Sequence, residues 1–205
     1  MIIGLDLDDL VGDFMGAVLA WHNCNYKTRF TRADARTYSF EKIFGVPTEE
    51  SIKRVDEFHK SDAFKHMAAL PGAIFKLNEL KRRGHDLPII TSRAEHLVRD
   101  DTIRWLDGKL PGILAGVYFS KNKYTNRGEK EKSEICDELR VDVMVDDNIC
   151  YVEQCAKPGR RVILYSNENT PWNHYPIKNE KERGIVRAPS WTRIAREIDR
   201  YASGE

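Results

Sequence analysis

Short apolar runs alternate with amphipathic helical patterns along most of this chain, and this alternation restricts the fold more than any other feature. Residues 2–5, 87–90, 141–145 and 162–165 are predicted strands, and residues 116–119 form a weaker fifth. Segments between them repeat apolar residues at the helical period. Strands that alternate with helices form βαβ units, and their right-handed crossovers produce a mostly parallel sheet. The sequence therefore predicts a three-layer, Rossmann-like α/β fold.

Residues 14–68 depart from this alternation. They contain no convincing strand, and they carry aromatic residues and helical patterns between the first strand and the rest of the sheet. We expect them to form a small helical cap, inserted into a single domain whose core comprises residues 1–13 and 69–205. Most of the cap's aromatic rings should form its hydrophobic core, although any of them could stack on a planar ligand.

The balance of charge favours a small partner. Lys and Arg total 33 and Asp and Glu total 32, so no net field attracts a nucleic acid polymer or an anionic membrane. No apolar stretch approaches the roughly 20 residues that span a bilayer. Acidic residues interrupt the N-terminal apolar run before a secretory signal could form, so we expect a cytoplasmic protein. The sequence does not indicate an oligomeric state.

Three polar segments lack any hydrophobic period. Residues 121–130, 167–173 and 178–184 are predicted loops, and the basic segment 121–130 is expected to be exposed to solvent.

Polar side chains follow three of the predicted strands. The first strand ends at Asp6 and Asp8, the second at residues 91–93 (Thr-Ser-Arg), and the strand at 141–145 ends at the pair 146–147 (Asp-Asp). In a parallel sheet the carboxyl ends of the strands share one edge, where ligands bind. Lys132, at the start of the helix before the last of these strands, joins the same edge.

This combination of groups suits phosphoryl transfer. Clustered carboxylates repel one another unless a hard cation neutralises them, and oxygen ligands of this kind suit Mg²⁺. The metal also shields a carboxylate nucleophile from the phosphate that it attacks. A hydroxyl and a lysine can bind the remaining phosphate oxygens. A second carboxylate can protonate the leaving alkoxide and later deprotonate water.

These residues resemble the four motifs of haloacid dehalogenase-superfamily phosphatases, in the same order. The motifs are Asp6-Leu7-Asp8 after an apolar strand, Thr91 after Ile89-Ile90, Lys132 before a helix, and Asp146-Asp147 after Val143-Met144-Val145. More narrowly, residues 6–14, 70–73, 91–92, 104–105 and 146–147 resemble the 5'(3')-deoxyribonucleotidase branch and its bacterial and phage relatives. The superfamily resemblance covers residues 1–14 and 70–165, and nothing in the cap aligns.

The resemblance implies catalytic roles for four residues. Asp6 would be the nucleophile that becomes phosphorylated, and Asp8 the general acid and base. Thr91 would hydrogen-bond the phosphoryl group, which Lys132 would clamp. Ser92 and Arg93 would lie close enough to contact the substrate.

The resemblance also implies a Mg²⁺ site made by Asp6, Asp8, Asp146 and Asp147. Asp6 and Asp146 would contribute carboxylates and Asp8 its backbone carbonyl, while Asp147 would orient these ligands.

Three positions depart from the family pattern or leave a choice open. Asp9 stands where the family commonly has Gly, and we expect it to be an exposed turn residue. Arg93 stands where the mammalian deoxyribonucleotidases have Pro, so it is a candidate for an extra phosphate or substrate contact. Lys130 competes with Lys132 as the clamp, and the spacing to the helix start favours Lys132.

The predicted function is a Mg²⁺-dependent phosphomonoesterase that acts through an aspartyl-phosphate on a small phosphate ester, most simply a nucleoside monophosphate. A sugar phosphate or another small ester is the enzymatic alternative. A receiver-like signalling module also combines an acidic pair with a hydroxyl, a lysine and Mg²⁺, but its phosphorylated Asp lies on a later strand and no long insertion follows its first strand. A non-catalytic ligand-binding relative is the remaining alternative.

Overall fold

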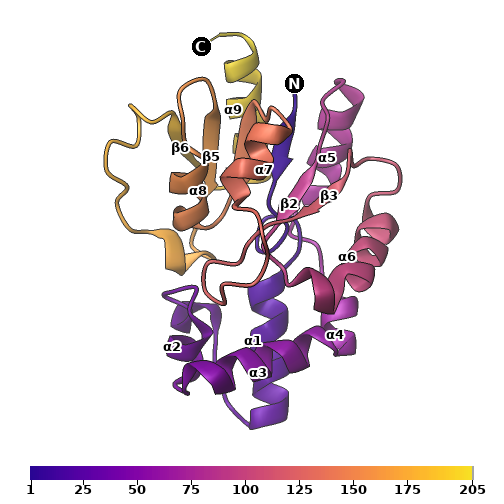
Figure 1. Cartoon of the computed structure of the whole chain (residues 1–205), viewed down its shortest axis with the longest axis vertical. Coiled ribbons are helices and arrows are strands. Elements are labelled where there is room, and N and C mark those ends of the chain that lie inside the picture. The colour runs from indigo at the N-terminus through magenta and orange to yellow at the C-terminus, as the bar shows by residue number, and fades with distance from the viewer. Residues whose placement is uncertain (205) are drawn as a thin grey trace.

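The computed structural model describes residues 1–204 and contains one sheet of six strands within them, in the order β3-β2-β1-β4-β5-β6 (Figure 1). The strands are β1 Ile3–Leu5, β2 Ile89–Thr91, β3 Val117–Phe119, β4 Val143–Asp146, β5 Arg161–Tyr165 and β6 Ile185–Ala188. All pairings between these strands are parallel. The α/β class is confirmed. Strand β6 was not predicted, because its four residues include an arginine and follow an irregular segment.

Helices cover both faces of the sheet, and the strand residues alternate between them. They are α5 Ala73–Arg82, α6 Glu95–Lys109, α7 Lys132–Glu138, α8 Ile149–Cys155 and α9 Trp191–Ala202. On β4, Met144 packs in one apolar cluster with residues of α7 and α8, whereas Val143 and Val145 pack in another with residues of α5 and α9. This two-residue alternation is what a sheet buried on both faces requires.

Residue types at two helix ends explain where the helices stop and start. Gly84 follows α5 in the left-handed conformation, with φ +83°, which glycine adopts without strain. The Ser190 hydroxyl accepts a hydrogen bond from the Arg193 backbone N–H at 3.2 Å and so caps α9.

Residues 14–65 contain helices and no strand in the described structure. They form α1 Phe14–Tyr26, the short 3-10 helix η1 Arg32–Asp34, α2 Phe40–Phe44, α3 Thr48–His59 and α4 Asp62–Lys65. Figure 1 shows α1 to α4 grouped together, apart from the sheet. Phe58 is fully buried among them, with its ring centroid 5.4 Å from that of Phe14 and 5.7 Å from that of Phe64. Much of the predicted aromatic core is therefore present.

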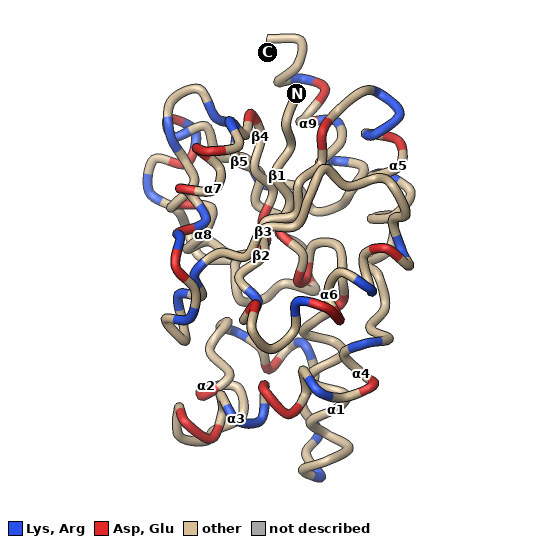
Figure 2. Tube along the Cα trace, turned by 45° about the vertical axis from the view of Figure 1, so that its right-hand side comes forward, with Lys and Arg blue, Asp and Glu red and all other residues tan. Residues whose placement is uncertain are grey.

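Charged residues of both signs are interspersed over the molecule (Figure 2). Within residues 1–204, no helix combines the length and the apolar character needed to cross a membrane.

A buried histidine joins α1 to α2 and α3. The His22 ring stacks on Phe44 and Tyr26, with centroid distances of 3.9 and 4.6 Å. Its Nε2 lies 3.1 Å from Nη1 of Arg54, and its Nδ1 lies 2.9 Å from the Thr28 hydroxyl. Arginine can only donate, so Nε2 accepts and the ring is neutral with its proton on Nδ1. Burial, and then the charge of Arg54, lower the pKa of His22 to about 4.

We expect this histidine to make the protein less stable in mild acid. The folded-state pKa lies below the ordinary value of 6.5, so between these values the unfolded chain binds the proton more readily, and stability is lost as the pH falls through 6.5 toward 4. Between pH 7.5 and 5, wild type should lose about 2 kcal/mol of unfolding free energy relative to His22→Gln. Urea unfolding at both pH values measures this. A constant difference between the two proteins would contradict it.

Candidate active site

The strand order reverses between β1 and β4, which creates a crevice beyond the carboxyl ends of these strands. The helical connection from β1 runs to β2 on one side, and the connection from β4 runs to β5 on the other. In open parallel sheets, ligands bind at such a reversal. Asp6 directly follows β1 and Asp146 is the last residue of β4, so the topology brings together carboxylates that are 140 positions apart in the sequence.

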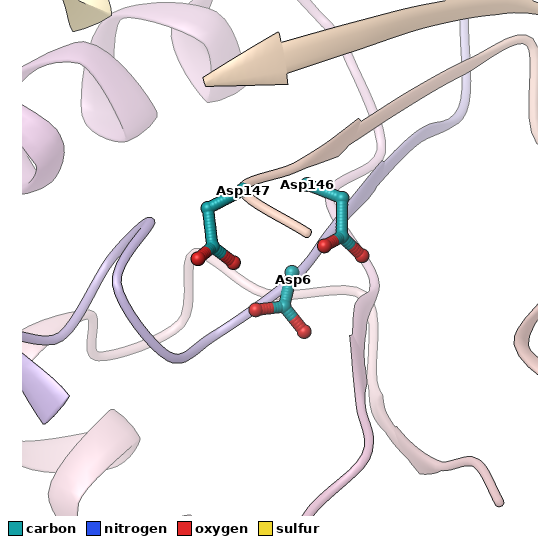
Figure 3. Close-up of side chains that lie close together, drawn as sticks. All are labelled: Asp6, Asp146 and Asp147. Atoms are coloured by element: carbon teal, nitrogen blue, oxygen red, sulfur yellow. The ribbon is translucent and has the colours of Figure 1, made fainter. Parts of the chain in front are cut away.

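Three buried carboxylates meet at this point. Asp6, Asp146 and Asp147 each offer an oxygen, and these oxygens lie within 4.8 Å of one another. Figure 3 shows Asp6 close to the pair that ends β4. The predicted cluster is thus present in the structure. The carboxylate of Asp8 is not part of it.

A buried lysine bridges two of these carboxylates. Lys132, the first residue of α7, places its Nζ 2.6 Å from Oδ1 of Asp6 and 2.7 Å from Oδ2 of Asp146. Its side chain is fully buried, and its Nζ lies 4.3 Å from the centroid of the Tyr151 ring. Lys130 is exposed and its Nζ lies 2.7 Å from Oε1 of Glu138. Of the two candidate lysines, the structure brings Lys132 into the cluster.

Burial of this many charges shifts their pKa values. Burial raises the pKa of Asp6 to about 7, with Asp146 and Asp8 adding to the rise and Lys132 opposing it. Burial, and then the charges of Asp146 and Asp6, raise the pKa of Asp147 well above its usual range. Three clustered carboxylates carry more negative charge than Lys132 alone can balance. An all-oxygen set with surplus negative charge fits a hard divalent cation such as Mg²⁺.

The segment 167–173, predicted as an irregular loop, holds Asp147 in place. It contains the 3-10 helix η2 Pro171–Asn173. Trp172 donates from Nε1 to Oδ2 of Asp147 at 2.7 Å. The Asn173 amide donates to the backbone carbonyls of Asp147 at 2.6 Å and Tyr165 at 2.7 Å. Sequence reasoning missed these residues, and a Trp beside an Asn in a polar segment was their only signal.

The remaining predicted residues lie around the cluster in different settings. Thr91 is fully buried, and its hydroxyl accepts from the Arg93 backbone N–H at 3.3 Å. Ser92 lines the pocket described below. Arg93 donates from Nε to both carboxylate oxygens of Asp8, at 3.1 and 3.0 Å, and from Nη2 to Oδ1 at 2.5 Å. The Arg93 side chain therefore faces Asp8.

The expectation that Asp9 is an exposed turn residue is wrong. Asp9 is fully buried and adopts a left-handed conformation with φ 55°. Its carboxylate accepts from the Met15 backbone N–H at 3.0 Å and from the Tyr38 hydroxyl at 3.0 Å. The tight turn after β1 points it toward the start of α1, where helix N–H groups favour an anion. Burial raises the pKa of Asp9 to about 7, although Arg32 opposes the rise.

A pocket of about 390 Å³ lies beside the carboxylates and reaches the helices of residues 14–65. From the sheet it is lined by Asp6, Asp8, Ser92, Arg93 and residues 146–148, and from the helical part by Phe14, residues 38–41 and several residues of α3. Its volume is within the range of small-molecule sites. Fully buried Lys132 and Thr91 are not among its lining residues.

The segment 121–130 forms another wall of this pocket and is not simply a solvent-exposed loop. Residues 122–125 and Arg127 line the cavity. The Asn122 amide donates to the Ser92 carbonyl at 3.0 Å. Arg127 makes two hydrogen bonds of 2.8 and 3.0 Å with the carboxylate of Asp56 in α3. The sequence offered no signal for these contacts, because they depend on a helix more than 60 positions away.

Comparison with known families identifies the chain. A family model described as 5' nucleotidase, deoxy (pyrimidine), cytosolic type C protein matches residues 1–199. The chain belongs to this nucleotidase family. Membership confirms the resemblance to haloacid dehalogenase-superfamily phosphatases and the predicted enzyme class, a phosphatase or nucleotidase. A provisionally named nucleotidase of Bacillus cereus is 23% identical over 198 residues, covering 95% of this chain and 96% of the relative.

Solved structures share the fold of this nucleotidase family member. A haloacid dehalogenase-like hydrolase from Streptococcus pneumoniae matches with a TM-score of 0.65 at 13% identity, covering 96% of this chain and 97% of the other. A haloacid dehalogenase-family hydrolase from Deinococcus radiodurans, solved with bound phosphate and sodium, matches with a TM-score of 0.66 at 15% identity, covering 98% and 96%. The strand order β3-β2-β1-β4-β5-β6 also differs from the 2-1-3-4-5 order of receiver modules, so the receiver-like alternative is wrong.

Proposed function

We propose that this protein is a Mg²⁺-dependent nucleotidase that hydrolyses nucleoside monophosphates through an aspartyl-phosphate. The observation that carries the proposal is the cluster of Asp6, Asp146 and Asp147 with Lys132 at the edge of a pocket large enough for a small phosphate ester. Family membership supports the class of reaction.

Asp6 is the proposed nucleophile. Lys132 contacts its Oδ1, which leaves Oδ2 to attack phosphorus. The buried ammonium holds the carboxylate in one orientation, and it can stabilise negative charge on the phosphoryl oxygens as transfer proceeds. The hydroxyls of Thr91 and Ser92, at the end of β2, would bind other phosphoryl oxygens.

Asp8 is the proposed general acid and base. It lies two residues after Asp6, and both line the pocket. Asp8 would give a proton to the leaving alkoxide, and would then take one from the water that hydrolyses the phosphorylated Asp6.

Mg²⁺ would be held by the carboxylates of Asp6 and Asp146 and the backbone carbonyl of Asp8. Asp147, fixed by Trp172, would orient these ligands. The ion supplies positive charge that lets an anionic nucleophile approach an anionic phosphate.

The pocket supports a nucleotide as the substrate. Tyr38 and Phe40 line it, together with polar residues of the segment 121–130. Aromatic faces can stack on any base, because stacking does not depend on the hydrogen-bond donors and acceptors of that base. We propose that residues 14–68 act as the cap that encloses the substrate and excludes water, and that the enzyme works in the cytoplasm.

A phosphate-release screen tests the proposal. Nucleoside 5'- and 3'-monophosphates, sugar phosphates and 4-nitrophenyl phosphate are each assayed with Mg²⁺ and with EDTA. We expect at least one nucleotide to have the highest kcat/KM, EDTA to abolish turnover and added Mg²⁺ to restore it. A sugar phosphate as the best substrate would contradict the nucleotide assignment. Full turnover in EDTA would contradict the requirement for Mg²⁺.

A further inference from the structure

The arginine that follows the Thr91-Ser92 pair is buried against the proposed proton donor. The Arg93 side chain is 2% exposed and the Asp8 side chain 17% exposed. Burying a guanidinium is costly unless all its donors find partners. The partners therefore indicate what the residue does.

Contacts from three separate segments of the chain fix the plane of this guanidinium. Its Nη1 donates to the Thr102 hydroxyl in α6 at 3.0 Å. Its Cζ lies 4.6 Å from the centroid of the Phe64 ring in α4, and its Nη2 lies 3.9 Å from the Met67 sulfur. Nε and Nη2 donate to Asp8. A rigid planar fork held on its face and at one edge cannot rotate, so the carboxylate that it grips has one orientation.

We infer that Arg93 is a positioning residue that acts through Asp8, an inference that rests on the proposed function. Arg93 holds the Asp8 carboxyl toward the pocket so that one oxygen can reach the leaving-group oxygen. A guanidinium N–H donates to the carbonyl oxygen of a protonated carboxyl as well as to a carboxylate, so the grip persists through both halves of the reaction.

One proton passes through Asp8 in each half of the reaction. In the first half, an Asp6 oxygen bonds to phosphorus, the bond from phosphorus to the leaving oxygen breaks, and the Asp8 proton passes to that oxygen to form the alcohol. In the second half, a water oxygen bonds to phosphorus, its proton passes to Asp8, and the bond to Asp6 breaks to release phosphate. Each proton transfer needs the Asp8 oxygen within hydrogen-bond reach of its partner, which is what the Arg93 fork secures.

The dependence of the rate on the leaving group distinguishes a positioning role for Arg93 from a structural role and from direct binding of phosphate. A nucleotide or other alkyl phosphate needs a proton on its leaving oxygen, whereas 2,4-dinitrophenyl phosphate does not. We expect Asp8→Asn and Arg93→Met each to lower kcat/KM, which reports the steps through departure of the leaving group, by about 100-fold on the best alkyl phosphate and by less than about threefold on the dinitrophenyl ester. The double variant should be no slower than Asp8→Asn, because both changes remove the same step. Arg93→Lys should recover part of the loss.

Controls separate positioning from folding. Arg99→Met changes an exposed arginine in α6, the helix that follows Arg93, where it pairs with Glu95. The rates with both esters should stay within about twofold of wild type, as for ordinary surface substitutions. If Arg93→Met does not fold, Thr102→Val removes the anchor of Nη1 while keeping the arginine, and should give a weaker form of the same leaving-group pattern.

Other outcomes overturn the inference. Equal losses of kcat/KM on both esters, or additive losses in the double variant, would make Arg93 a structural residue. A raised KM on both esters that persists in the Asp8→Asn background would make it a direct phosphate ligand. If wild type itself shows no Asp6-dependent hydrolysis of either ester, the proposed function fails, and the inference fails with it for that separate reason.

Discussion

Asp6→Asn is expected to lower phosphate release from 4-nitrophenyl phosphate in Mg²⁺ by roughly 10³-fold or more, the scale seen when a covalent nucleophile is removed. The amide keeps the shape of the side chain but is a poor nucleophile. Folding should be preserved, because Lys132 keeps its second partner Asp146, and because burial raises the pKa of Asp6 to about 7, which means that the cost of burying its charge exceeds what Lys132 offsets. Initial rates and urea unfolding of the variant measure both effects.

Asp142→Asn is the matched control. Asp142 precedes β4 at the opposite end of the sheet, and its carboxylate accepts from the Ile2 backbone N–H at 2.8 Å. Asn keeps an acceptor oxygen but loses the charge, so the weaker bond should cost at most about 1 kcal/mol of stability and leave kcat/KM nearly unchanged. Turnover by Asp6→Asn comparable to that of Asp142→Asn would eliminate Asp6 as the nucleophile.

Lys132→Met should reduce both activity and stability. The ammonium is fully buried between Asp6 and Asp146, and although burial lowers its pKa, these carboxylates more than offset that effect and raise it well above the usual value. Removing one partner of a buried ion pair typically costs about 3–5 kcal/mol, because the remaining charge is left uncompensated. We also expect kcat to fall by at least about 100-fold, since a charge aimed at the reacting oxygens is lost.

Lys130→Met provides the comparison within the same segment. Lys130 is exposed and pairs with Glu138, and exposed pairs contribute roughly 0–1 kcal/mol. Urea unfolding and phosphate release should therefore be close to wild type for this variant. If Lys130→Met lost more activity than Lys132→Met, the assignment of the buried lysine would be wrong.

The strands that position the site could be predicted because each combines two local signals. A buried parallel strand needs a nearly continuous apolar run, and residues 3–5 and 143–145 have one that stops abruptly at carboxylates. Helices between these strands were equally visible from their apolar period. Strand β6 was not, because it includes an arginine and follows an irregular segment. The short helices α2 and α4 were not, because four or five residues are too few to show a helical period.

Much of the pocket could not be predicted. Arg127 and Tyr124 occur in a polar, basic segment whose composition is that of any surface loop, yet they line the cavity because α3 and the Asp56 carboxylate lie opposite. Asp9 looked like one more acidic turn residue, and only the packing of α1 and Tyr38 against it makes it buried. Burial of a polar side chain is decided by what covers it.

The sequence by itself determined which chemical groups stand at the strand ends and in which order, because an apolar run followed by carboxylates is a local pattern. The tertiary structure decided which groups meet. It placed Lys132 between Asp6 and Asp146 while leaving Lys130 in solvent, and it turned Arg93 onto Asp8. Those pairings follow from the reversal of strand order between β1 and β4 and from helices packed over distant segments, and such long-range contacts have no local trace in the chain.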